Sequence, residues 1–218
     1  MWPASERRRS NGAARSATRG SVMVHGQRTG ANLLEASRAR DHHSAWTIAL
    51  HWISVLGIIV VAVSGLLREI LDDGPLRVAL LEVHKQTGLF VLLVLAGRIG
   101  VRAAVGMADH AGDLPILLRR AAQLAHLVLY MMLLALPLLG LAVSNAHGVR
   151  VRLFGVLPLP SLVDEDADVV DALTDYHVWG AWVLLILVVA HVGAALWHHW
   201  VRRDAVLAAM LPLVRRRR

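Results

Sequence analysis

The sequence predicts an all-α integral membrane protein, a bundle of four transmembrane helices followed by a short surface helix. Of its 218 residues, 56% are hydrophobic and only 18% are charged, and the mean hydropathy is +0.52. A soluble domain has about 25% charged residues. The apolar residues are also concentrated in four long blocks, so the composition indicates a membrane protein rather than a soluble one.

The four apolar blocks cover approximately residues 45–67, 80–102, 121–143 and 177–200. Each block is close to the ~20 residues that an α-helix needs to cross about 30 Å of hydrocarbon. Pro137 falls inside the third block, where a membrane helix tolerates a proline. We therefore expect one transmembrane helix for each block.

The regions that flank the blocks are polar or basic. Residues 1–40 contain many Arg, Ser, Gly and Ala residues without apolar periodicity, which predicts a disordered basic tail and no cleaved export signal. The transmembrane domain is expected over 41–213, and 214–218 form a basic C-terminal tail. Within the domain, 202–210 are predicted to form a short helix along the membrane surface, or else an unstructured segment that anchors the topology.

Basic and acidic residues are separated across the predicted bundle. Arginines gather in the N-terminal tail, in the connection between the second and third blocks and at the C-terminus, whereas the other connections are acidic. The positive-inside rule then places both termini in the cytoplasm and the acidic loop around 164–175 in the periplasm. We expect the inner (cell) membrane of a bacterium. The net charge of +7 follows this membrane pattern, so nucleic-acid binding is not expected.

The chain has no cysteine and twelve histidines. Without cysteine there are no disulfides, thiolate zinc sites, iron–sulfur clusters or covalent haem attachment. A metal or haem would therefore depend mainly on histidine. Because ionisable residues inside membrane segments are costly, the histidines within the four blocks are functional candidates.

The spacing of these histidines is specific. His177 and His191 lie fourteen residues apart in the fourth block, which puts them about 21 Å apart on nearly the same face of one helix. This arrangement suits two b-type haems stacked in the core of a bundle. Topology and depth pair His51 with His191 near the cytoplasm, and His84 with His177 near the periplasm, as axial ligands of the haem iron. Two imidazole ligands leave no open iron position, which favours electron transfer.

Two other interpretations of the histidines remain. Each could be an interfacial residue bonded to water or to a backbone carbonyl, although four histidines at paired depths make that reading less attractive. A zinc site fits poorly, because His177 and His191 are too far apart to share one ion.

Several motifs also follow one another in the order of the predicted helices. They are His51-Trp52, His84-Lys85-Gln86-Thr87-Gly88, Ala125-His126-Leu127-Val128-Leu129-Tyr130, Tyr176-His177, His191, Ala194-Ala195, His198-His199, Asp204 and Leu211-Pro212. Over roughly residues 42–213 the chain thereby resembles the bacterial cytochrome b561 family. The resemblance implies a di-haem, quinone-linked electron-transfer protein of the inner membrane with the same ligand pairs. The best-studied type of this family is similar to superoxide oxidases, which pass an electron from periplasmic superoxide to ubiquinone.

Four further residues are candidates for the site. Arg98 should reach the level of the cytoplasmic haem, either in a salt bridge to a propionate or as an interfacial residue that sets topology. Gly88, one turn from His84, either lets a porphyrin approach the backbone or packs helices. His126 is expected to bond a propionate or a quinone, or to be an interhelical histidine. His198 is the best candidate for binding quinone or handling its proton.

The predicted function is an oxidoreductase that moves single electrons between a periplasmic donor, superoxide or a soluble redox protein, and ubiquinone. Two alternatives are a cytochrome b anchor subunit of a respiratory dehydrogenase or hydrogenase complex, and a non-redox transporter that uses the same histidines. The positive charge that would attract the superoxide anion comes from Lys85, Arg77, Arg150 and Arg152. Six acidic residues around 164–175 would oppose it.

Overall fold

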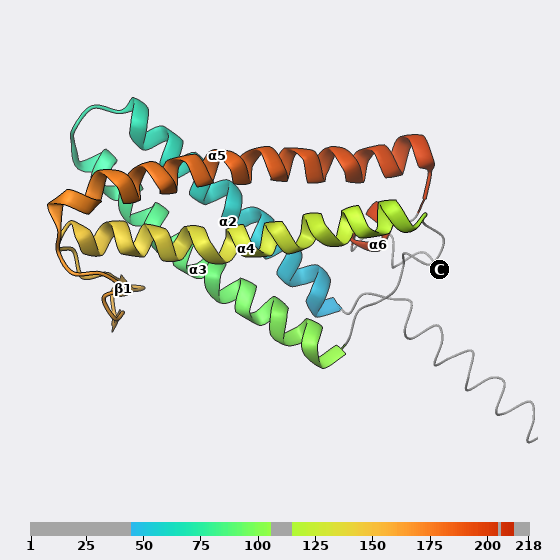
Figure 1. Cartoon of the computed structure of the whole chain (residues 1–218), viewed down its shortest axis with the longest axis horizontal. Helices are drawn as coiled ribbons and strands as arrows, with labels where there is room; N and C mark the ends of the chain where they lie inside the picture. The colour runs from blue at the N-terminus through green and yellow to red at the C-terminus, as the bar shows by residue number, and fades with distance from the viewer. Residues whose placement is uncertain (1–44, 106–114, 205, 212–218) are drawn as a thin grey trace, which may run out of the picture. The chain divides into compact units, whose positions relative to one another are not determined.

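The computed structural model describes residues 45–105, 115–204 and 206–211 (Figure 1). Four long helices contain most of these residues: α2 (Ala45–Ile70), α3 (Pro75–Val105), α4 (Ile116–Ala146) and α5 (Ala167–Trp197). All four are long and apolar enough to cross a membrane, so the predicted membrane bundle is confirmed. The predicted basic tails at 1–40 and 214–218 lie outside the described residues.

The helices are longer than the apolar blocks, because hydropathy does not mark the polar turns at helix ends. Helix α3 begins at Pro75, whose missing N–H would be unbonded in the first turn anyway. Helix α5 begins after Asp166, whose side chain accepts the N–H of Asp168 at 2.9 Å, as an N-cap does. Helix α4 runs through Pro137 without interruption.

The early start of α5 corrects the predicted acidic loop. Asp168, Asp171 and Asp175 were expected in a loop but lie in the first turns of the helix. The positive end of the helix dipole favours negative charge there, most strongly in the first turn. Only the residues before the N-cap, Asp164 and Glu165, belong to the connection itself.

The helices pack as two pairs, α2 along α3 and α4 along α5, and α3 joins α4 (Figure 1). Val91, Leu95 and Leu133 form a buried cluster where α3 meets α4. Helix α5 packs against α4 yet has no buried residue along its length.

Each helix crosses the bundle once, which defines two ends. We call inner the end where α2 and α4 begin and α3 and α5 stop, on the right in Figure 1. The outer end holds the turn between α2 and α3 and the connection between α4 and α5. His51 and His191 lie nearer the inner end, and His84 and His177 nearer the outer end.

The outer connection contains a small hairpin that the sequence did not predict. Strands β1 (Arg152–Leu153) and β2 (Leu157–Pro158) pair antiparallel, with Leu153 opposite Leu157. Strands of two residues are too short to show a period of two, so the sequence carries no signal for them. Phe154 and Gly155 turn the chain with positive φ angles of 52° and 73°.

One amide side chain anchors this hairpin to α3. Gln86 Nε2 donates to the carbonyl of Arg152 at 3.0 Å, and Gln86 Oε1 accepts the N–H of Phe154 at 2.8 Å. Val151 is buried in a cluster with Leu89 of α3 and a leucine of α4. The hairpin is thus a fixed part of the outer end.

At the inner end, α5 continues as a five-residue π-helix, η1 (His198–Arg202), followed by the single turn α6 (Val206–Ala209). The surface helix predicted over 202–210 is therefore shorter than expected. Arg203 is the reason, because its left-handed conformation (φ 53°) ends the preceding helix.

Candidate functional site

The outer pair of predicted ligands lies face to face. His84 is nine residues into α3 and His177 is ten residues into α5, so the two helices present them at equal depth. Their ring centroids are 6.0 Å apart, with 74° between the ring planes. The structure therefore brings together the two histidines that depth alone had paired.

This separation suits a shared metal ion. A bond from imidazole nitrogen to a metal is about 2 Å long, so two rings on opposite sides of one ion have centroids roughly 6 Å apart. Among residues 45–105, 115–204 and 206–211, no group of three or more His, Asp or Glu side chains is placed to hold an ion by itself. Two opposed imidazoles suit a haem, whose macrocycle supplies the remaining ligands.

A contact between His84 and α2 indicates which ring nitrogen is left for a metal. His84 Nδ1 lies 2.9 Å from the carbonyl oxygen of Val61 on α2. A bond of this kind assigns the proton to Nδ1 and leaves the Nε2 lone pair for a metal. Gly65, one turn further along α2, makes room for the ring: a Cβ there would lie 3.0 Å from His84 Nδ1.

A second glycine makes room for His177. A Cβ built on Gly140 of α4 would lie 3.1 Å from His177 Cε1. The ring is packed closely against the backbone of α4, near Leu136. Each outer histidine is thus received by a glycine of the neighbouring helix, which indicates a site built to hold the two rings in place.

Three histidines meet at the inner end. The centroids of His51 and His191 are 6.5 Å apart, again the spacing of a shared ion, with 62° between the planes. His126 of α4 is also close to His191, at 5.4 Å, and its Nδ1 lies 2.7 Å from the carbonyl of Ala122 on its own helix. His126 therefore belongs to the inner site beside the predicted pair.

Arg98 reaches the same level. Its guanidinium lies 3.4 Å from the hydroxyl of the buried Ser54 and 5.3 Å from the ring centre of Tyr130. Since Ser54 is one turn from His51, Arg98 stands beside the inner pair, where a cation can meet a propionate. A Cβ on Gly88 would meet nothing within 4 Å, so the space beside this glycine is open.

His198 lies beyond the inner pair, at the first position of the π-helix. Its Nδ1 is 2.5 Å from a carboxylate oxygen of Asp204, and its ring meets Trp197 edge-on at 5.3 Å. The prediction placed His198 on the same face as His191. The widened turn of the π-helix and the contact with Asp204 were not foreseen.

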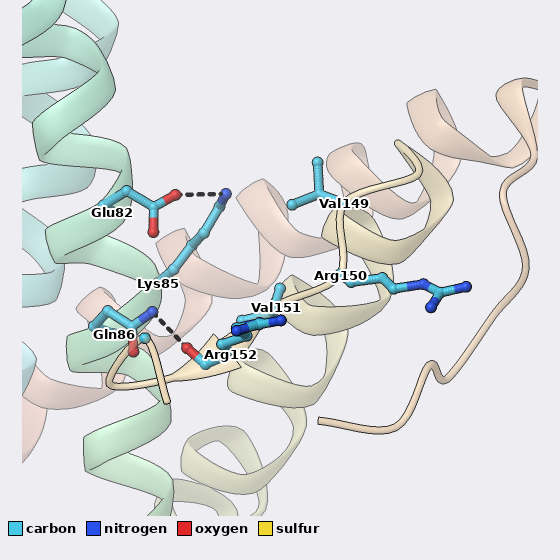
Figure 2. Close-up of a pocket in the computed structure, with 8 residues that line it drawn as sticks. Glu82, Lys85, Gln86, Val149, Arg150, Val151 and Arg152 are labelled. Atoms are coloured by element: carbon cyan, nitrogen blue, oxygen red, sulfur yellow. Dashed lines mark hydrogen bonds and ion pairs between the residues drawn. The ribbon is translucent and has the colours of Figure 1, made fainter. Parts of the chain in front are cut away.

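The outer end also has a basic cleft of about 190 Å³ between α3 and the hairpin (Figure 2). Its charged lining consists of Glu82, Lys85, Arg150 and Arg152, and Lys85 Nζ lies 3.1 Å from Glu82. At about 100° per residue, Glu82 and Gln86 lie roughly opposite His84 on α3, and Lys85 lies about a quarter turn from it. The cleft thus lies beside the outer pair and not in front of it.

Sequence reasoning missed several residues of the site. Gly65, Gly140 and Ser54 are small residues within the predicted helices, but the sequence does not show which neighbouring helix each one faces. Tyr130 and Asp204 stood in the motifs that suggested a family without being given a role. Their contacts appear only once the helices are packed together.

Similarity to known proteins extends over the whole bundle. The chain matches the family model described as prokaryotic cytochrome b561 over residues 42–213. It is 30% identical to cytochrome b561 homolog 1 of Escherichia coli (strain K12) over 173 residues, 79% of this chain and 98% of that protein. Homolog 2 of the same organism is also 30% identical, over 78% of this chain and 92% of its own length. The probable superoxide oxidase CybB of Yersinia pestis is 25% identical over 170 residues, 78% of this chain and 96% of that protein.

Proposed function

The chain belongs to the prokaryotic cytochrome b561 family of membrane electron-transfer proteins with b-type haem, and from this premise we propose that it carries two haems and oxidises superoxide with ubiquinone. The family predicted from the motifs is thereby confirmed. The observation that carries the proposal is the pair of opposed histidines at each end of the bundle, joined by α5.

Four residues would hold the two haems. His84 and His177 would ligate the outer haem, and His51 and His191 the inner one, with Arg98 beside the inner pair and Gly88 near the outer pair. When bound, haem would supply one-electron oxidation and reduction, and ligation by two imidazoles would favour electron transfer. The ligands on α5 are fourteen residues, about 21 Å, apart.

At the outer end, the protein's own charges would raise the local concentration of an anionic donor. Lys85, Arg150 and Arg152 outnumber the single acidic residue of the cleft, Glu82. The cleft need not touch the ligand pair, because charges act over about 10 Å at moderate ionic strength. Asp164 and Glu165 in the connection oppose this attraction, whereas the charge of Asp168 in the first turn of α5 is partly offset by the positive end of the helix dipole.

At the inner end, His126 and His198 are the residues proposed to serve ubiquinone. His126 contacts the ring of His191, and His198 lies seven residues further along the same helix. Because the Nδ1 of each ring meets an oxygen of the protein, Nε2 is the atom that can face the quinone, and His198 can exchange a proton there. We place the inner end at the cytoplasmic side of the bacterial inner membrane, as the arginines of the connections indicate.

Stopped-flow spectroscopy tests the proposal. A pulse of superoxide should reduce the haems of the purified protein, ubiquinone should reoxidise them, and superoxide dismutase should abolish the first step. Replacing Lys85, Arg150 and Arg152 together by glutamine should slow reduction about tenfold at low ionic strength and little at high salt. The charge-preserving Lys85→Arg variant is the matched control. Haems that superoxide does not reduce would exclude this donor.

A further inference from the structure

Three departures from regular helix geometry occur together just after α5. The α-helix widens into a π-helix at His198, Arg203 takes a left-handed conformation (φ 53°, ψ 36°), and the backbone N–H of Asp204 returns to the carbonyl of His198 at 3.2 Å. Isolated π turns and left-handed residues other than glycine are uncommon and gather at functional sites. Their joint result is to bring one carboxylate under one imidazole.

The pair they create is short and largely buried. Asp204 Oδ2 lies 2.5 Å from His198 Nδ1, and the two side chains are 28% and 16% exposed. Arg202 Nε is 3.7 Å from the same carboxylate oxygen, and its guanidinium lies over the ring of Trp197 at 5.7 Å. Arg202 is thus a charged neighbour of this pair, and helix α6, which follows, has only apolar residues.

The segment is also fastened to the inner ligand. Trp52 Nε1 donates to the carbonyl of Met210, just after α6, at 2.8 Å. Trp52 in turn meets the ring of His51 edge-on, with centroids 5.7 Å apart. The His198–Asp204 pair is therefore held in a fixed relation to the inner histidine site by contacts of both α5 and α2.

We propose that Asp204 is a positioning residue that holds His198 in its Nδ1-protonated form, so that Nε2 faces the quinone. The proposal rests on the proposed function. Reduction of one quinone by two superoxide ions consumes two protons and yields one quinol and two O₂. Nδ1 keeps its proton on the Asp204 side, and Nε2 carries the exchanged one: His198 gives the Nε2 proton to a quinone oxygen and takes a replacement on Nε2 from water, while the second proton comes from water. The carboxylate of Asp204 remains ionised throughout, as an orienting group does.

The first test does not require turnover. ¹⁵N NMR of histidine-labelled protein in nanodiscs, reduced so that low-spin iron is diamagnetic, reports which ring nitrogen carries the proton. The signal of His198 is identified by its absence in His198→Gln. Asp204→Asn should change the tautomer of that residue alone, whereas Asp204→Glu and Arg202→Gln should keep it. A tautomer unchanged in Asp204→Asn would overturn the proposal.

The second test is a double-mutant cycle on haem reoxidation by ubiquinone. Asp204→Asn should slow reoxidation about tenfold in the wild-type background and hardly at all in His198→Gln, because residues that act through one another are not additive. Both variants should keep the haem spectrum and reduction by superoxide. If the loss of reoxidation rate in the double variant equals the product of the two single losses, the residues act independently and the positioning role is wrong. Wild-type haems that ubiquinone never reoxidises would overturn the proposed function and this role with it, even with the NMR result intact.

Discussion

Replacing Gly65 by alanine should displace His84 and weaken the binding of the outer haem that we propose. A Cβ at this position would lie 3.0 Å from Nδ1 and 3.1 Å from Cε1 of His84. Favourable contact needs about 3.5–4.0 Å, so the ring must move by about 0.5 Å. It cannot do so freely, because Nδ1 is bonded to the carbonyl of Val61 on the same helix as Gly65.

The size of the effect follows from this displacement. A shift of about 0.5 Å exceeds the roughly ±0.2 Å expected for metal–ligand distances. Overpacking of this kind costs about 1–3 kcal/mol, which corresponds to roughly 5- to 150-fold weaker haem binding. Gly100→Ala on α3 is the matched control, because a Cβ there meets nothing within 4 Å.

The assay is the ratio of haem to protein after purification, with the two proposed haems distinguished by redox titration. In Gly65→Ala the ratio should fall from two towards one, and the transition that disappears should be the one missing in His84→Ala. Gly100→Ala should keep both transitions. Two haems with unchanged potentials in Gly65→Ala would refute the steric reasoning, and selective loss of the inner haem would refute the pairing.

The same ratio tests the remaining ligands: His177→Ala should lose only the outer haem and His191→Ala only the inner one, and loss of neither would contradict ligation by these histidines. Gly140→Ala, whose Cβ would lie 3.1 Å from Cε1 of His177, should show a milder form of the His177→Ala defect; full haem content would argue against close packing there. Gln86→Leu removes both hydrogen bonds to the hairpin and should reduce local stability by about 1–3 kcal/mol. Limited proteolysis within 150–158 should then be faster than in wild type, with haem content retained; an unchanged rate would mean that Gln86 does not anchor the hairpin.

Much of the ligand arrangement could be predicted from the sequence because it depends on regular helix geometry. The fourteen-residue spacing of His177 and His191 fixes their separation and their common face once the segment is helical. The alternation of four crossings then fixes which end holds His51 and which holds His84. Depth along each helix is thus encoded locally.

Helix ends and connections were harder to predict. Hydropathy located the apolar cores but not the first turns of α5, where Asp168 and its neighbours are polar yet helical. The hairpin depends on Gln86, more than sixty residues away in sequence, for two of its hydrogen bonds. The hairpin is therefore held by contacts between distant segments, and a local sequence pattern does not contain such contacts.

The sequence by itself therefore determined the four crossings and the pairing of histidines by depth, since both follow from composition and from the constant rise of an α-helix. Only the tertiary structure decided how each histidine is seated. The rotation of each helix about its axis places Gly65 against His84 and Gly140 against His177, and the irregular turn after α5 carries Asp204 back to His198. Those contacts depend on the packing of whole helices against one another, so they exist only in the folded bundle.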